Sequence, residues 1–158
     1  MALTADAERL AFLLETTAKE ARHLRQTVDR LAAEPISAEW VSRLEQEPEL
    51  SERLDAFVAR FGRLQDTLGE KLIPELLRHL LEDVGSMLDN LGRMERLGSL
   101  PSLEGWIEAR NLRNRLIHEY MRDPEEFAGA LLRAIELVPL LETTQANLRA
   151  ASQRFLST

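Results

Sequence analysis

Apolar residues recur at alternating spacings of three and four along the N-terminal part of the chain, and this spacing restricts what the segment can fold into. An α-helix has about 3.6 residues per turn, so residues three or four apart lie on the same face. The pattern predicts one long amphipathic helix over about residues 5–33, with Thr4 as its N-cap. The repeating positions are Leu10, Leu13, Thr17, Ala21, Leu24, Val28 and Leu31.

The same spacing returns three more times. A second main helix begins near Leu50 and runs on past Pro74, a third covers the segment from Trp106 to Arg122, and a fourth follows Pro124 to about Phe155. Short helices are predicted over residues 38–46 and after Ser86. No strand alternation, hairpin signal or internal repeat is found. The sequence therefore predicts an all-α fold, an up-and-down four-helix bundle with one or two short extra helices, as a single domain over residues 1–158.

Several residues mark where helices begin, end or bend. Pro48 is expected to end the short helix, Pro74 to kink the second main helix or open a new one, and Pro139 to kink the last. Gly62 and Gly69 either weaken their helix or let a neighbour approach closely. The predicted N-caps of the later helices are Ser37, Ser86, Ser102 and Asp123.

Composition limits the classes of function. The 158-residue chain carries a net charge of −7, so nucleic acid would have to bind at a local basic patch rather than over the whole surface. Its densest arginine cluster consists of Arg110, Arg113, Arg115 and Arg122. The chain has no cysteine, which excludes disulfides and thiolate chemistry. It has no apolar run long enough for a membrane span and no signal peptide pattern, so a cytoplasmic location without membrane contact is expected.

The segment WIEARNLRNRLIHEYMR, from Trp106 to Arg122, is unusual because its predicted apolar face contains cations. On a helical projection Arg110, Arg113 and Asn114 fall inside that arc, flanked by His118 and Tyr120. Burying an unpaired cation is costly, so inward arginines need an anionic partner, an interface or a ligand. Arg115 falls on the opposite, solvated side. The apolar members of the arc are Leu103, Trp106, Ile107, Ile117 and Met121.

A purely structural explanation is available for these arginines. Each can pair with a carboxylate on a neighbouring helix, and this interpretation is favoured more for Arg110 than for Arg113. Glu20, at the edge of the first helix's apolar stripe, is the predicted carboxylate.

The same residues also suit a chemical role. The ordinary pKa of histidine is about 6.5, which allows His118 to move protons near neutral pH. Arg113 can hold a phosphate, and Asn114, one turn before His118, can orient the imidazole or donate to an oxyanion. This set suits metal-free cleavage of RNA, with His118 deprotonating the ribose 2′-hydroxyl. A two-fold dimer would supply a second His118 as the acid.

The pattern Arg-x4-His-x-Tyr on a helix, followed by Asp-Pro, resembles the HEPN superfamily and most closely its HepT-like members; residues 97–131 carry the resemblance. It implies a homodimeric bundle with a metal-independent ribonuclease site at Arg113 and His118. It also implies a toxin–antitoxin pair, in which a nucleotidyltransferase antitoxin of the MntA type transfers AMP to Tyr120. Asn114 matches the common Arg-Asn form of the motif.

Three hypotheses follow from the sequence. The first is a ribonuclease toxin with Arg113, His118 and Asn114 as catalytic residues, Arg110 binding RNA, and no metal or cofactor. The second is a non-catalytic HEPN subunit that docks a nucleotidyltransferase as its substrate-binding half. The third is a structural helical dimer whose arginines are paired with carboxylates such as Glu20.

Overall fold

A computed structural model describes residues 3–118 and 122–157, and these residues form helices joined by short turns, without a strand. The predicted all-α bundle is confirmed. The π-helical segment η1 joins α3 and α4 without a break. The elements are α1 (Ala5–Leu31), α2 (Ala38–Ser42), α3 (Pro48–Asp66), η1 (Thr67–Leu72), α4 (Ile73–His79), α5 (Met87–Arg96), α6 (Leu103–His118) and α7 (Pro124–Leu156).

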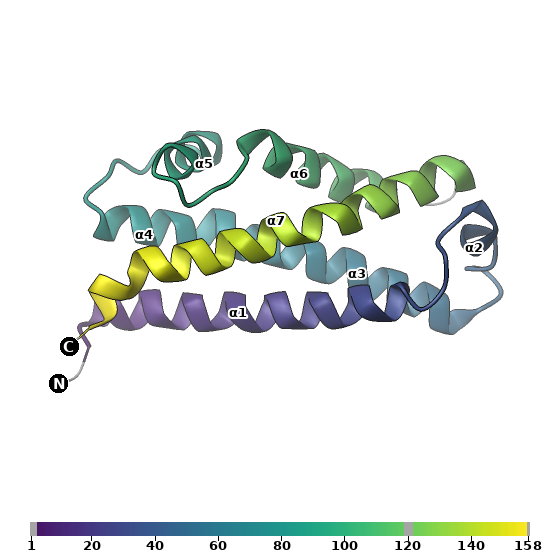
Figure 1. Cartoon of the computed structure of the whole chain (residues 1–158), viewed down its shortest axis with the longest axis horizontal. Helices are drawn as coiled ribbons and strands as arrows, with labels where there is room; N and C mark the ends of the chain where they lie inside the picture. Colours follow the sequence, from purple (N-terminus) through teal and green to yellow (C-terminus); the bar gives the residue numbers. More distant parts are fainter. Residues whose placement is uncertain (1–2, 119–121, 158) are drawn as a thin grey trace.

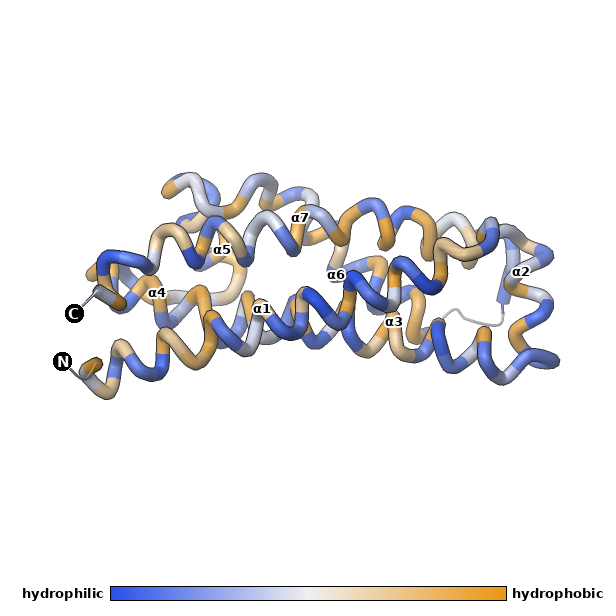
Figure 2. Tube along the Cα trace, turned by 60° about the horizontal axis from the view of Figure 1, so that its bottom comes forward, coloured by the Kyte–Doolittle hydropathy of each residue, from blue (hydrophilic) through white to orange (hydrophobic). Residues whose placement is uncertain are grey.

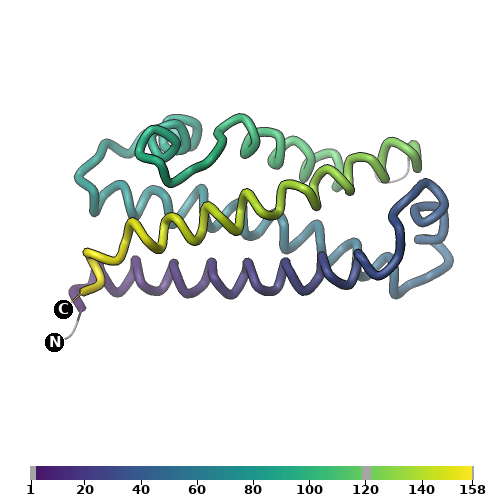
Figure 3. Tube along the Cα trace, viewed as in Figure 1, coloured from purple at the N-terminus to yellow at the C-terminus, as the bar shows by residue number. Residues whose placement is uncertain are grey.

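Four long rods run alternately in opposite directions: α1, the α3–η1–α4 rod, α6 and α7 (Figure 1). Helix α1 packs against α3 and α7, and α6 packs against the same two, so α1 and α6 lie diagonally across the bundle. Both ends of the chain lie at one end of the bundle (Figure 3). The short helices α2 and α5 lie at opposite ends. This is the up-and-down arrangement expected from the sequence.

Every predicted N-cap is found at the start of its helix. The side-chain oxygens of Thr4, Ser37 and Ser86 accept hydrogen bonds from the first turns of α1, α2 and α5. Ser102 Oγ accepts from the Gly105 amide at 2.9 Å, and Asp123 Oδ1 accepts from the Glu125 amide at 3.0 Å. Because these side chains satisfy amides that a helix leaves unpaired, the sequence specifies where each helix begins.

One proline, Pro48, takes a role different from the expected one. Pro48 begins α3 at its first turn, and α2 ends earlier, at Ser42. A proline suits this position because the first-turn amides have no helical partner. Pro74 likewise occupies the first turn of α4, one of the two roles expected for it. Helix α7 continues through Pro139 to Leu156.

The core is built from the inward faces of all four rods. Short hydrophobic and hydrophilic stretches follow one another along the long helices (Figure 2). This pattern is typical of amphipathic helices, which turn one apolar side to the core. The largest fully buried side chains include the aromatic rings of Phe57, Phe61 and Trp106, and Trp40 of α2 closes one end of the core. None of the described helices is long and apolar enough to cross a bilayer.

Candidate functional site

Helix α6 carries the motif and is fixed on its inner side by contacts with the α3–η1 rod. Trp106 is fully buried and packs against Gly69 of η1, where an added Cβ would lie 3.5 Å from the indole. Gln65 Nε2 of α3 donates a hydrogen bond to the Ala109 carbonyl at 3.2 Å. On the other side, Arg133 of α7 forms an ion pair with Glu108 at 2.7 Å. These contacts set which face of α6 meets the core.

The buried face of α6 differs from the predicted one. The buried side chains are Trp106, Ala109, Leu112 and Leu116. On a helical projection this face is turned by about 120° from the predicted arc. Ile107 and Ile117, both expected in the core, are 39% and 50% exposed.

The physical reason for this rotation is the cost of burying charge. The predicted face would have buried Arg110 with Asn114, whereas the observed face contains no charged residue at its four buried positions. Exposing two isoleucines costs less than burying an unpaired guanidinium. The helix therefore turns its arginines away from the core and leaves the isoleucines uncovered.

The outward face of α6, defined by Ile107, Arg110, Asn114, Ile117 and His118, holds most of the predicted site. All five residues are exposed. Asn114 and His118 are one turn apart and lie on the same side of the helix. Arg110 Nη1 lies 3.1 Å from the sulfur of Met87 on α5. Three polar groups are thus presented beside two uncovered apolar side chains.

Tyr120, the residue predicted to receive AMP, lies outside the described residues.

Among the described residues of the motif, Arg113 differs from Asn114 and His118 because its side chain is partly buried against α3. Its side chain is 30% exposed, and Nη1 forms an ion pair with Asp66 Oδ1 of α3 at 2.6 Å. The guanidinium also lies against Gly62, where an added Cβ would be 2.7 Å from Cζ. The sequence favours an ion pair more for Arg110 than for Arg113 and predicts Glu20 as the carboxylate for either. The structure differs, because Arg113 forms an ion pair and Asp66, not Glu20, supplies the carboxylate.

Glu20 instead links α1 to η1 by a hydrogen bond. Its Oε2 accepts a hydrogen bond from Thr67 Oγ1 at 3.1 Å, while Oε1 is buried without a hydrogen-bond partner in the described part of the chain. Burial raises the pKa of this carboxyl above its ordinary value, and the hydrogen bond from Thr67 and the charges of Arg63 and Lys71 only partly offset the effect. The Glu20 carboxylate bonds to the residue that follows Asp66, but it is not the partner of Arg113.

Arg113 and His118 do not converge within one chain. Five residues of α-helix correspond to a rotation of about 140° and a rise of about 7.5 Å, so the two side chains leave α6 in different directions. Arg113 points to α3, whereas His118 ends the helix on the exposed side. A site that uses both needs a second surface opposite α6.

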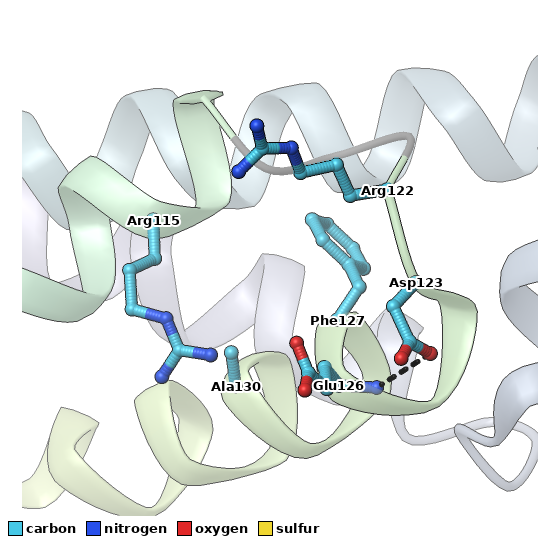
Figure 4. A pocket seen from close by; sticks show the side chains of 6 residues that line it. All are labelled: Arg115, Arg122, Asp123, Glu126, Phe127 and Ala130. Carbon is cyan, nitrogen blue, oxygen red and sulfur yellow. Dashed lines mark hydrogen bonds between the residues drawn. The ribbon is translucent and has the colours of Figure 1, made fainter.

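The predicted cluster of four arginines is divided among different surroundings. Arg115 is exposed, as expected, and lines a small pocket of about 100 Å³ with Arg122 at the α6–α7 turn (Figure 4). Asp123 and Glu126 line the same pocket, and their carboxylates oppose the binding of an anion. Arg110 lies beside α5 and Arg113 beside α3. The four residues do not form one basic patch.

A second hollow lies next to the outward face of α6. It is an open groove of about 310 Å³ between α3 and α6. Exposed Ile117 forms part of its edge, so the apolar surface of α6 continues onto α3. The groove is lined by Leu54, Asp55, Val58, Ala59, Leu116 and Ile117.

No family model matches the chain, and no similar protein is found among curated proteins or solved structures. Within residues 3–118 and 122–157, no three histidine, aspartate or glutamate side chains gather closely enough to hold a metal ion. The assignment of a function therefore depends on the residues of α6 and on what surrounds them.

Two residues of this site were not predicted, Gly62 and Asp66. They are four positions apart on α3, hence on one face of the helix, and both contact Arg113. Close approach of a neighbour was one of the two roles expected for Gly62. The pairing of α3 with α6 was the missing information, because helical periodicity does not say which helices touch.

Proposed function

We propose that this protein is a metal-independent endoribonuclease toxin of the HEPN, HepT-like type that acts in the cytoplasm as a homodimer. The observation that carries the proposal is the outward face of α6, where Arg110, Asn114 and His118 are exposed beside two uncovered isoleucines. Polar groups that suit phosphate and proton chemistry lie there on a surface that suits a second protein chain.

A dimer would account for two surface features that have no role in a single chain. Ile107 and Ile117 are large apolar side chains at the surface, and the groove beside Ile117 is open. A second copy placed on the outward face of α6 covers both, and two-fold symmetry then brings two His118 side chains to one cleft. Arginines are well suited to such a wet interface.

The proposed reaction is an internal transesterification of RNA. His118 of one copy takes the proton of the ribose 2′-hydroxyl, and the 2′-oxygen attacks the adjacent phosphorus. The bond from phosphorus to the 5′-oxygen breaks, and the second copy's His118 gives that oxygen a proton. Arg113 stabilises the charge on the phosphate, Asn114 orients the imidazole, and Arg110 binds a neighbouring phosphate. The products are a 2′,3′-cyclic phosphate and a 5′-hydroxyl.

The proposed partner is a nucleotidyltransferase antitoxin of the MntA type, which silences the ribonuclease by attaching AMP to Tyr120. This part of the proposal is supported by the sequence motif alone. An AMP adduct on the motif tyrosine adds a bulky anion to the segment that carries His118, and such a charge would repel an RNA phosphate.

The chemistry of the products tests this function. The purified protein is incubated with a single-stranded RNA in excess EDTA, and the new 3′ ends are identified by mass spectrometry. We expect 2′,3′-cyclic phosphate ends, and no cleavage of DNA of the same sequence, because DNA lacks the attacking hydroxyl. Cleavage of both polymers, or of neither, contradicts the proposal. A stable complex with a nucleotidyltransferase but no cleavage would instead support a docking subunit.

A further inference from the structure

We infer that Gly62 and Asp66 of α3 are positioning residues for Arg113, holding its guanidinium in place for a phosphate in the proposed ribonuclease site. This inference rests on the proposed function but concerns residues outside the α6 motif. It starts from the observation that α3 holds Arg113 by an ion pair and by a close backbone contact.

The contact has two points, one helical turn apart on α3. At Gly62 the guanidinium lies so close to the backbone that a Cβ would meet Nε and Cζ, the latter at 2.7 Å. At Asp66, Oδ1 accepts a hydrogen bond from Nη1 at 2.6 Å. A flat group resting on a backbone surface and bonded at one corner has little freedom to rotate. Arg113 is therefore oriented before any RNA arrives.

The same contact leaves part of the guanidinium available. Only Nη1 of Arg113 forms a hydrogen bond within the described chain, so Nε and Nη2 retain their donors. The Arg113 and Asp66 side chains are 30% and 43% exposed, and an ion pair as exposed as this one contributes little to stability. The pair is better explained by orientation than by stability.

Substituting Gly62 with alanine separates these two explanations. The three atoms nearest to its Cβ all belong to the flexible Arg113 side chain, which would have to move. Alanine favours a helix over glycine, so Gly62→Ala should not lower the melting temperature. A structural contact predicts unchanged cleavage, whereas a positioning contact predicts a loss. Gly129→Ala is the matched control, because a Cβ on that helical glycine of α7 meets nothing within 4 Å.

The experiment measures kcat and KM for RNA cleavage, together with the melting temperature, for the wild type, Gly62→Ala, Asp66→Ala and Gly129→Ala. We expect kcat to fall by about 100-fold in Gly62→Ala and about 10-fold in Asp66→Ala, as misplaced catalytic groups commonly cause. KM should not rise in Asp66→Ala, because removing a carboxylate favours an anionic substrate. Gly129→Ala should match the wild type.

A second set of measurements repeats these substitutions in an Arg113→Ala background with enzyme in excess over RNA. Residues that act through Arg113 should cause no further loss there, whereas independent effects would add. Wild-type rates in Gly62→Ala and Asp66→Ala, or losses that add to that of Arg113→Ala, overturn the inference and leave the ribonuclease function standing. A wild type that cleaves no RNA overturns both.

Discussion

Replacing His118 with alanine should reduce RNA cleavage by at least about 1,000-fold. General acid and general base catalysis each contribute factors of about 100 to 10,000, and a two-fold site loses both when both copies of His118 are replaced. The residue is exposed at the end of α6, so its removal should change the free energy of unfolding by less than about 0.5 kcal/mol. Cleavage rates and thermal unfolding of the same preparation measure the two effects.

A matched control is available for that substitution. His23 is exposed on α1, the helix diagonal to α6, and its replacement by alanine should leave cleavage unchanged. The proposed role of His118 is wrong if His118→Ala retains more than about a tenth of wild-type activity, because loss of a general acid and base costs far more than tenfold.

Replacing Ile117 with glutamate should convert the dimer to a monomer and abolish cleavage, although Ile117 has no chemical group that could take part in the reaction. The side chain is 50% exposed in the single chain and lines the groove between α3 and α6. Two-fold symmetry places the new carboxylate in the interface twice, so we expect the dissociation constant to rise by at least about 100-fold. Light scattering during size-exclusion chromatography gives the mass, and the same fractions are assayed with RNA.

The control for this change is Phe12→Glu. Phe12 is 67% exposed on α1, across the bundle from α6, and its replacement should affect neither the mass nor the cleavage. If Ile117→Glu stays dimeric and active, the second copy does not bind at the outward face of α6.

Most of the fold was predictable because it depends on local chemistry. Capping side chains such as Thr4 and Asp123 satisfy amides within their own first turns, so they mark helix starts without knowledge of the partner helices. The spacing of leucines along α1 likewise predicts a helix and its apolar face without knowledge of the neighbouring helices. Pro48 was misassigned because a proline can follow one helix or begin the next, and neighbouring residues do not decide between these roles.

The face of α6 was harder to predict because two arcs of the helix are apolar. One contains Ile107 and Ile117, and the other contains Leu112 and Leu116. Counting apolar residues does not choose between them, but the cost of burying Arg110 does. In α6, a charged residue within an apolar arc indicates an exposed face more strongly than the large apolar residues beside it indicate a buried one.

The environment of Arg113 depended on information that the sequence does not hold. Asp66 precedes Arg113 by 47 residues in the sequence, and only the packing of α3 against α6 brings Asp66 and Gly62 to Arg113. A glycine four residues from an aspartate on one helix face does not by itself predict a binding site for an arginine. The site can be recognised only once the neighbouring helix and its arginine are known.

The central claim is that two copies of His118 act in one cleft, and mixed dimers test it most directly. Wild-type and His118→Ala chains with different tags are mixed in equal amounts, allowed to exchange subunits, and assayed at constant total protein. If each cleft needs both histidines, only wild-type homodimers cut RNA, and random pairing leaves about a quarter of the full activity. Activity of about a half, with mixed dimers present, would show that each chain acts alone and would contradict the claim.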